Sequence, residues 1–502
     1  MSWRRGVDRL RAASKARVPE LTRRRTVPPL GRFGIAGLRL GSALAAWAVL
    51  ERKKDISGPR LSRRLRVAFE RLGPTYIKLG QIISSGQGVF PEYLVDEFKR
   101  CRDKVPPETF AAVRQVVEED LGRPLHEVFD RFERVPLAAA SVAQVHAATL
   151  RTGEEVVVKV QRPQVGELVR KDVEAMAWVA PFLVGRIPIT ALANPPALVE
   201  LFAETIVEEL DFRLEAENML DVARVQAQTG NRIMIVPRPH PSLVTRRVLV
   251  MERLHGFAFD DVTSVQAAGI DTHAMLRAAM ISTLEGAMLY GVFHGDLHGG
   301  NLFIAEDGRI ALLDYGITGR LEEHERQAFV RLLVGGTLND VRAQLSAFRD
   351  LGALPPGTDF ETMIRELRLD QPMTDPTTMS ADQLMAEIQT VIKGLLGWGA
   401  RLPKPLMLFV KNMLFLDSAI ALHAPDIDLF AEILAIAQYF GQTHGERLAA
   451  DVGMDVREHR VDVDQMKRNL GFDPSITLSH RDLQERRKLI RERFKQRRAG
   501  AG

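Results

Sequence analysis

The chain has 502 residues, of which 46% are hydrophobic and 26% are charged. These fractions are typical of a globular protein and exclude a disordered one, and the length predicts two or three packing units. The single cysteine, Cys101, excludes an internal disulfide framework and a cysteine-based metal cluster, and it fits a reducing, cytoplasmic compartment.

Charge is distributed unevenly along the chain. Residues 1–66 carry about 18 Lys and Arg against about 4 acids, and residues 481–502 carry about 9 against about 3, although the net charge of the whole chain is only +4. Basic ends are typical of segments that touch an anionic surface, but two solubilising tails would carry the same charges. A membrane and a nucleic acid would both supply such a surface. The basic residues are not interleaved with aromatic ones, which disfavours nucleic acid.

The first 26 residues contain no apolar core of a signal peptide. The best membrane candidate is "FGIAGLRLGSALAAWAVL", residues 33–50, which is about as long as a minimal membrane span. It carries Arg39 and is followed by "ERKK", so an interfacial helix is favoured over one that crosses the bilayer. We expect residues 1–60 to be a basic segment that contains this helix and associates peripherally with a membrane.

Residues 61–130 are expected to form a helical extension interrupted by prolines. Within it, "GPTYIKLGQIISS" predicts a buried helix that begins at Pro74. Lys78 and Gln81 are three residues apart and therefore share one face of that helix. An ammonium group among so many apolar neighbours needs an anionic partner or a route to water.

Residues 131–255 mix strands with helices. The runs "SVAQVHAATL" and "VVVKVQR", joined by "RTGEE", predict a β-hairpin within residues 135–162. Apolar periodicity predicts helices at about 165–185 and 196–228. The runs "RIMIVPRPH" and "RRVLVMERL" then predict two further strands.

After residue 255 the chain is predicted to be mostly helical to about residue 445, apart from a β-rich patch at 293–318. Lys411 and Asp417 interrupt the apolar run "LMLFVKNMLFLDSAIAL", which favours a globular core. Strands with an inserted helix, followed by a helical half, are the order of the two lobes of a kinase. The expected fold class is α+β and two-lobed, with an extension at 61–130, a small β lobe with inserted helices at 131–255, a large helical lobe at 256–445 and a basic C-terminal tail at 446–502.

The β-rich patch reads "VFHGDLHGGNLFIAEDGRIALLDYG" and carries the strongest chemical signal. Asp296 and Asn301 are five residues apart in a loop, and Asp314 follows a hairpin turned by Asp307-Gly308. Phosphoryl transfer needs a carboxylate beside the attacking group and oxygen ligands that hold Mg²⁺ against the phosphates. An Asp-x4-Asn loop followed by Asp-aromatic-Gly supplies both, as in the H-R-D-x4-N and D-F-G motifs of protein kinases. A polar hairpin that happens to be acidic is the alternative.

A kinase-like site also needs a strand lysine and a loop that covers the phosphates. Lys159 in "VVVK" stands at the expected distance after the run "PLAAASVAQV". In that run Ala138, Ala140 and Ala143 occupy the positions of the three glycines of G-x-G-x-x-G-x-V, with Val145 in register. Alanine restricts φ and adds a methyl group, so this backbone should not wrap phosphates as a glycine loop does. The predicted nucleotide-binding residues of this alanine loop are Ala138, Ala139, Ala140, Ser141, Val142, Ala143 and Val145.

Several acids in "IVEELDFRLEAENM" are candidate partners for Lys159. On a straight helix Glu208, Asp211 and Glu215 would share one face, and Glu209 would lie about 100° away. An ordinary acidic helix face has much the same pattern, so the pattern alone does not select a partner.

Taken together, these motifs resemble the UbiB-type (AarF/UbiB) atypical kinase-like family, which is associated with ubiquinone biosynthesis. The resemblance covers about residues 60–440 and rests on K-x-G-Q at Lys78, the alanine loop, E-x-D at Glu209, and the HGDLHGGN and DYG pair, in that order. It implies that the K-x-G-Q helix folds over a nucleotide cleft and that Lys78 pairs with Glu209. It also implies that Lys159 pairs with Glu215.

One departure from the family pattern concerns the catalytic loop. The family usually has Pro-Gly before the asparagine, whereas this chain has Gly299-Gly300 before Asn301. Loss of the proline loosens the loop, although Gly-Gly can adopt the same backbone shape. The departure bears on the affinity for metal.

The resemblance implies ATP and Mg²⁺ as cofactors, with ATP between the lobes and adenine against the backbone from Met251 to Leu254. Lys159 would contact the α- and β-phosphates. Lys78 and Gln81 would cover the place where a peptide substrate lies in an ordinary kinase. This favours ATP hydrolysis or small-molecule phosphotransfer over protein kinase activity. The resemblance also implies a role with prenyl-quinone or other isoprenoid lipids at a membrane, alongside quinone-biosynthesis proteins.

Three alternatives stay open. A small-molecule phosphotransferase of the aminoglycoside or choline kinase type shares "HGDLH…N" and the later aspartate, but has no K-x-G-Q helix ahead of its small lobe. A true protein kinase is disfavoured by the alanine loop. A non-catalytic scaffold that binds nucleotide and lipid is disfavoured because the strand lysine, both aspartates and the asparagine are all present.

Overall fold

The computed structural model of the chain describes residues 2–23, 31–50, 59–84, 92–101, 105–183, 195–338, 340–371, 394–395, 397–401, 403–453, 461–469 and 472–500. The chain divides into two compact units. Unit 1 comprises Met1–Leu220, Pro237–Leu254 and Asp314–Ile317, and unit 2 comprises Asp221–Val236, His255–Leu313 and Thr318–Gly502.

Unit 1 contains an antiparallel sheet with the strand order β1-β3-β4-β7-β6, in which β2 also pairs with β3. The predicted hairpin is formed by β3 and β4 and turns at Gly153, whose φ of +85° favours glycine. The valines at positions 156, 158 and 160 of β4 pack against the helices α6 and α7. Because side chains alternate between the two faces along a strand, Lys159 lies on the opposite face of the sheet. The bounds are β1 Phe129–Phe132, β2 Ala138–Ala139, β3 Ala143–Leu150, β4 Glu155–Gln161, β6 Pro239–Val244, β7 Val248–Glu252, α6 Phe110–Leu121 and α7 Leu125–Val128.

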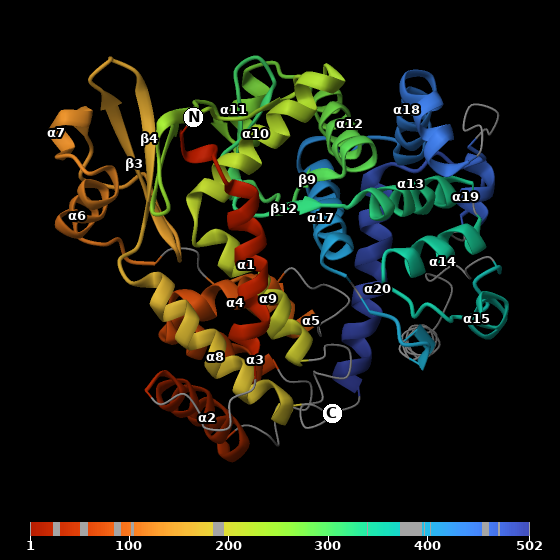
Figure 1. Cartoon of the computed structure of the whole chain (residues 1–502). Coiled ribbons are helices and arrows are strands. Elements are labelled where there is room, and N and C mark those ends of the chain that lie inside the picture. Colours follow the sequence, from red (N-terminus) through yellow and green to blue (C-terminus); the bar gives the residue numbers. More distant parts are fainter. Residues whose placement is uncertain are drawn as a thin grey trace. The chain divides into compact units, whose positions relative to one another are not determined.

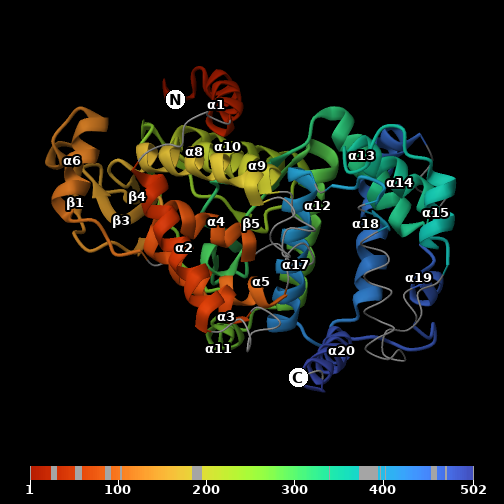
Figure 2. The same cartoon turned by 90° about the horizontal axis from the view of Figure 1, so that it is seen from below.

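The helices α1 to α5, α8 and α9 share a second core, to which the alanine loop contributes Val142. Figure 1 shows α1 lying along α8 and α9, and in Figure 2 α1 is seen from its end, beside α8. The helices α2 and α3 also lie side by side. The turn between α3 and α4 is made by Gly73, which has a φ of +101°. The bounds are α1 Val7–Thr22, α2 Arg32–Leu50, α3 Pro59–Leu72, α4 Pro74–Ser84, α5 Glu92–Phe98, α8 Val165–Leu183, α9 Pro195–Glu209 and α10 Phe212–Thr229, with the one-turn η1 at Ser2–Arg4.

The prediction of a single helix at 196–228 is wrong, because the helix is interrupted at Leu210-Asp211, between the end of α9 and the start of α10. Gln161 Nε2 donates a hydrogen bond to the Leu210 carbonyl at 3.1 Å, and the Phe212 amide donates to the Arg246 carbonyl at 3.0 Å. These bonds tie the break to the sheet. The Asp211 carboxylate then accepts from the Arg213 amide at 3.2 Å, which suits the start of a new helix.

Unit 2 contains the predicted β-rich patch as two small sheets. One sheet has the order β5-β11-β10-β8, and β9 pairs with β12 in the other. β10 and β11 form an antiparallel hairpin whose turn includes Gly308 with a φ of +80°, as predicted. The bounds are β5 Met234–Ile235, β8 Phe257–Ala258, β9 Val292–His294, β10 Leu302–Ile304, β11 Ile310–Leu312 and β12 Thr318–Arg320.

Helices make up most of the rest of unit 2, so the chain is mixed α+β as predicted. The segment after residue 445, predicted as a basic tail, contains the end of α18 and the helices α19 and α20. Asp417 of α17 contacts two of its residues, His480 at 3.0 Å and Arg487 at 2.5 Å. The bounds are α11 Val262–Ala267, α12 Thr272–Tyr290, α13 Glu323–Thr337, α14 Val341–Asp350, α15 Phe360–Leu367, α17 Lys404–His423, α18 Leu429–Val452, α19 Val463–Asn469 and α20 His480–Gly500.

Candidate functional site

Lys159 of β4 is the centre of a buried cluster of charges in unit 1. Its ammonium donates to Glu215 Oε1 at 2.7 Å and lies 3.3 Å from Asp314 Oδ1. Glu215 is in the first turn of α10, and its side chain is only 4% exposed, whereas the side chain of Asp314 is 42% exposed. The pair Lys159–Glu215, which the resemblance implied, is therefore present, with Asp314 as an additional, more accessible neighbour.

The electrostatics of this cluster favour a further cation. Burial opposes the charge on Lys159, but the carboxylates of Asp314 and Glu215 outweigh it and raise the pKa of the ammonium. Burial raises the pKa of Glu215 to about 7, while Lys159 opposes this rise and Asp314 reinforces it. One ammonium faces two carboxylates, so ionisation of both leaves an excess of negative charge. A divalent cation at the exposed Asp314 would balance it.

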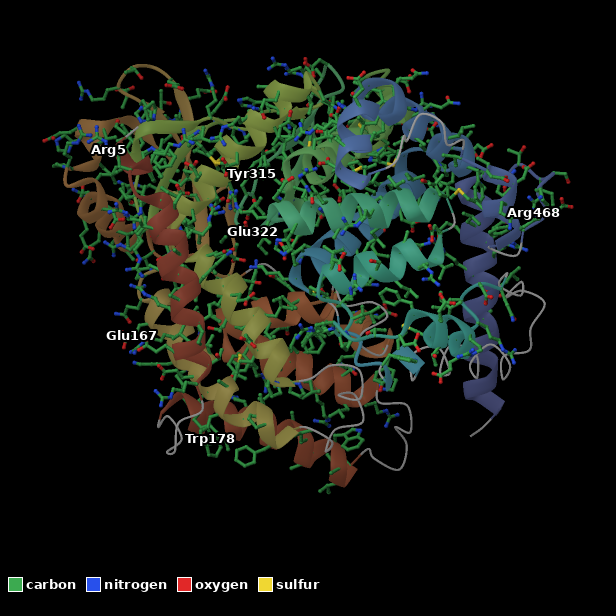
Figure 3. The ribbon with its side chains drawn as sticks, turned by 45° about the vertical axis from the view of Figure 1, so that its right-hand side comes forward. Arg5, Glu167, Trp178, Tyr315, Glu322 and Arg468 are labelled. Atoms are coloured by element: carbon green, nitrogen blue, oxygen red, sulfur yellow. The ribbon has the colours of Figure 1, made fainter. Side chains whose placement is uncertain are left out.

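The segment Asp314–Gly316 is fixed by one local hydrogen bond and one to a residue distant in sequence. The Gly316 amide donates to Asp314 Oδ1 at 2.8 Å, and Asn218 Nδ2 donates to the Tyr315 carbonyl at 2.9 Å. Tyr315, labelled in Figure 3, is fully buried. A Cβ atom at Gly316 would lie 3.2 Å from Asp314 Oδ1, which explains a glycine there. Sequence analysis missed Asn218, although it lies one helical turn after Glu215 in the acidic run.

Lys78 of α4 has the anionic partner that its apolar surroundings require. Its ammonium lies 2.7 Å from Glu209 Oε1, and the two side chains are 14% and 12% exposed. Asp211 does not share this contact, because it pairs with Arg213 at 2.7 Å. Gln81 is half-buried on the same helix, three residues after Lys78. The implied pair Lys78–Glu209 is therefore present, and a regulatory role for these residues stays a prediction.

Gly80 explains the glycine of the K-x-G-Q motif and gives a first prediction. A Cβ atom there would lie 2.9 Å from Phe98 Cδ1 and 3.2 Å from Cys101 Sγ, so α4 packs against α5 with no room for a methyl group. We expect Gly80→Ala to lower the free energy of unfolding by about 1–3 kcal/mol in chemical denaturation. The matched control is Gly441→Ala on α18, which meets no atom within 4 Å. It should raise the stability by about 0.5–1 kcal/mol, and equal effects of the two changes would contradict the packing argument.

The alanine loop is anchored by Arg162, which sequence analysis missed. The Arg162 side chain donates to the Ala140 carbonyl at 2.9 Å and to Glu108 Oε1 at 2.7 Å, and its amide donates to the Val142 carbonyl at 2.9 Å. Ser141 and Val142 are buried at the tip of the loop. The sequence signal that could have revealed this anchor is an arginine directly after β4, the strand that carries Lys159. The loop is thus fastened to the coil ahead of α6.

The other predicted loop residues and the predicted adenine contacts also belong to unit 1. Ala138 and Ala139 form β2 and pair with Val145 and Gln144 of β3, and the Ala140 amide donates to the Ala143 carbonyl at 2.8 Å. Met251 is buried within β7, and Leu254 follows that strand half-buried. Contact of these residues with a nucleotide stays a prediction.

The loop that carries Asp296 and Asn301 belongs to unit 2. The Asp296 amide donates to His294 Nδ1 at 3.1 Å, and the Asp296 carboxylate forms an ion pair with Lys411 of α17. Gly299–Asn301 forms a one-turn 3-10 helix, η4, and the Asn301 carbonyl accepts from the Leu313 amide at 2.9 Å. Gly299-Gly300 therefore gives a regular turn that ends at Asn301 without the proline.

The predicted metal ligands fit Mg²⁺ by their chemistry. No group of three His, Cys, Asp or Glu side chains forms a ready-made metal cluster among the described residues. Asn301 and Asp314 offer amide and carboxylate oxygens, which are hard donors. Mg²⁺ is usually held by one or two protein ligands together with phosphates and water. Asn301 belongs to unit 2 and Asp314 to unit 1, and binding of Mg²⁺ by these two residues stays a prediction.

The helices α2 and α3 form a basic and apolar surface, here called the α2–α3 surface. The exposed apolar residues Ile35, Leu38 and Val49 fall on one stripe of α2, at spacings of three and eleven residues. Phe33 makes an edge-to-face contact with Trp178 of α8, labelled in Figure 3, with ring centroids 4.9 Å apart. An adjoining cleft of about 730 Å³ has no acidic residue among its described lining. Its charged lining residues are Arg39, Arg60, Arg63, Arg64 and Arg71.

Two described helices, α2 and α17, are long and apolar enough to cross a membrane by length and composition alone. They differ in burial: 6% of the α2 window is buried inside the structure, against 39% for α17. The predicted interfacial helix at 33–50 is thus a largely exposed helix. The predicted core helix at 406–422 is more buried.

The chain is similar to a family of atypical kinase-like proteins and to several individual proteins. Residues 100–346 match the family model described as the ABC1 atypical kinase-like domain. An uncharacterized protein of Mycobacterium tuberculosis, Rv0647c, is 36% identical over 374 residues, which cover 73% of this chain and 75% of that protein. A probable protein kinase UbiB of Pseudomonas aeruginosa is 33% identical over 408 residues, which cover 78% of this chain and 74% of that protein. The solved complex of Rv3197 with erythromycin, also from M. tuberculosis, is 22% identical with a TM-score of 0.39 and covers 65% of this chain and 89% of that one.

Proposed function

Because the chain belongs to the ABC1 atypical kinase-like family, which includes proteins named UbiB, we propose that it is a Mg²⁺-dependent ATPase or small-molecule phosphotransferase. The observation that carries the proposal is the cluster of Lys159, Glu215 and Asp314. A buried lysine held by a helix glutamate, next to a more exposed aspartate, is the arrangement that phosphate and Mg²⁺ binding requires in kinases.

The proposed roles follow from the side chains. Lys159 contacts the α- and β-phosphates and is oriented by Glu215. Asn301 and Asp314 hold Mg²⁺, which supplies charge neutralisation to the phosphates when bound. Asp296 orients or deprotonates the attacking hydroxyl or water.

The alanine loop and the K-x-G-Q helix favour ATP hydrolysis or a small acceptor over a peptide. Arg162 and the burial of Val142 hold the alanine loop in place, so it lacks the freedom of a glycine loop. Lys78 fixes α4 to the end of α9 through Glu209, which stabilises the helix that we propose to exclude peptides. The aminoglycoside and choline kinase type is disfavoured because it lacks this helix.

We further propose that the protein works in the cytoplasm at the surface of an anionic membrane, on prenyl-quinone or isoprenoid lipids with quinone-biosynthesis proteins. The α2–α3 surface supports the membrane part. Exposed apolar side chains beside an arginine-lined cleft suit the boundary between acyl chains and phosphate headgroups.

The double variant Leu38→Asp with Val49→Asp should reduce the share of the protein that floats with anionic vesicles, because it places two charges on the exposed apolar stripe of α2.

Mg-ATP turnover by the purified chain tests the proposed function. Phosphate release is measured with zwitterionic vesicles, with vesicles that contain an anionic lipid, and with a prenyl-phenol added. We expect anionic vesicles to stimulate release and Asp314→Asn to reduce it to background, because the metal loses its carboxylate ligand. Lys78→Ala should gain autophosphorylation if the K-x-G-Q helix excludes peptides. A wild-type chain that binds nucleotide without turnover would support the scaffold alternative, and one that does neither would overturn the proposal.

A further inference from the structure

Asp296 is held by a helix that lies more than a hundred residues later in the chain. Lys411 of α17 forms an ion pair with Asp296 Oδ1, and the two side chains are 23% and 18% exposed. The next residue, Asn412, is fully buried and holds the same loop at two points. Its Oδ1 accepts from the Leu297 amide at 3.4 Å, and its Nδ2 donates to the His294 carbonyl. Consecutive residues of α17 thus fix both the backbone of the loop and its carboxylate.

α17 is itself secured near its C-terminal end. Thr272 Oγ1 donates to the His423 carbonyl at 2.7 Å, and His423 Nε2 hydrogen-bonds the Phe259 carbonyl at 2.7 Å. The C-terminal end of α17 is therefore fixed relative to Phe259 and to the start of α12 in unit 2. A fixed helix gives the Lys411 ammonium a defined position, which a lysine on a mobile loop would lack.

We infer that Lys411 is a positioning residue for the proposed reaction, and this inference rests on the proposed function. Its ammonium holds one oxygen of the Asp296 carboxylate and so restricts rotation about the Cβ–Cγ bond. The carboxylate then meets the attacking hydroxyl or water in one orientation instead of several, which lowers the entropy to be lost in the transition state.

A purely structural role for Lys411 is a weaker explanation. The two side chains are mostly buried, and desolvation offsets much of the Coulombic gain of such a pair, so the pair is weak evidence for a stabilising role. Asn412 already satisfies the backbone of the loop. A lysine in the apolar run of α17 is therefore best explained by the carboxylate that it contacts.

The inference is tested by steady-state turnover of Lys411→Met and Lys411→Arg in the full-length chain. We expect kcat to fall by about 10- to 100-fold in the methionine variant, with the Kd for Mg-ADP within about twofold of wild type. Arginine should restore part of kcat. Lys404→Met, two turns earlier on α17, is the matched control and should leave kcat unchanged. Lys411→Met should also add little to Asp296→Asn, because both changes remove the same interaction.

Chemical rescue separates positioning from folding. The single cysteine, Cys101, is buried, so a cysteine introduced by Lys411→Cys is the accessible thiol of the variant. Alkylation with bromoethylamine converts it to a lysine analogue, and we expect kcat to recover in the same protein sample. Wild-type turnover without any loss in Lys411→Met, or a loss that neither arginine nor alkylation reverses, would overturn the inference. Absence of turnover in wild type would instead overturn the proposed function.

Discussion

Replacing Lys159 with methionine is expected to abolish Mg-nucleotide binding and to lower the free energy of unfolding by about 3–5 kcal/mol. The change leaves Glu215, whose side chain is 4% exposed, without the ammonium that lies 2.7 Å from it. A buried carboxylate without its cation is the most costly outcome of breaking such a pair. Denaturant unfolding and calorimetric titration with Mg-ADP measure the two effects.

A double variant distinguishes the role in binding from the role in stability. Lys159→Met with Glu215→Gln removes both charges, so it should recover at least half of the lost stability while nucleotide binding stays absent. The recovered stability shows that the protein is folded when binding is measured. If the folded double variant bound Mg-ADP as tightly as wild type, Lys159 would not be a phosphate ligand.

The second large effect is expected at Asp296. Asp296→Asn keeps the shape of the side chain but removes the carboxylate that we propose to act as base, so turnover should fall by about 10²–10⁴-fold. Mg-ADP should bind with unchanged affinity, because the proposed phosphate and metal contacts are made by other residues. Single-turnover hydrolysis of ATP is the measurement.

Asp307→Asn is the matched control for this change. Asp307 lies in the β10–β11 turn of the same motif, where it is 53% exposed and pairs with Arg309. Its replacement should change turnover by no more than about twofold. Comparable losses in both variants would mean that turnover depends on the acidity of the whole hairpin and not on one base.

The elements that sequence predicted well are those with local signals. Two β-prone runs on either side of a turn that contains glycine predicted β3 and β4, and the Asp307-Gly308 turn predicted β10 and β11. The two ion pairs of Lys78 and Lys159 were implied by the family resemblance, because spacing on a helix allowed several partners. The catalytic role of Lys159 and the regulatory role of Lys78 stay predictions.

The features that sequence missed depend on distant contacts. Apolar periodicity continues across Leu210-Asp211, so it cannot reveal a break imposed by hydrogen bonds from Gln161 and to Arg246. Lys411 is separated from Asp296 by 115 residues, and no local pattern links them. Arg162 likewise acts through residues 22 and 54 positions earlier in the chain.

The burial of Tyr315 has a consequence for the design of inhibitors. In protein kinases the packing of the aromatic residue of the Asp-aromatic-Gly motif sets the active or inactive state, so a compound could bind by selecting a conformation in which this residue has left its pocket. Here that ring is fully buried, the backbone carbonyl beside it is held by Asn218, and the preceding Asp314 lies 3.3 Å from Lys159. Such a compound could bind only after the buried Tyr315 ring had left the core, which would cost the free energy of the cavity left behind. If the chain binds a nucleotide as proposed, compounds that compete directly with that nucleotide are therefore the better starting point for a chemical probe.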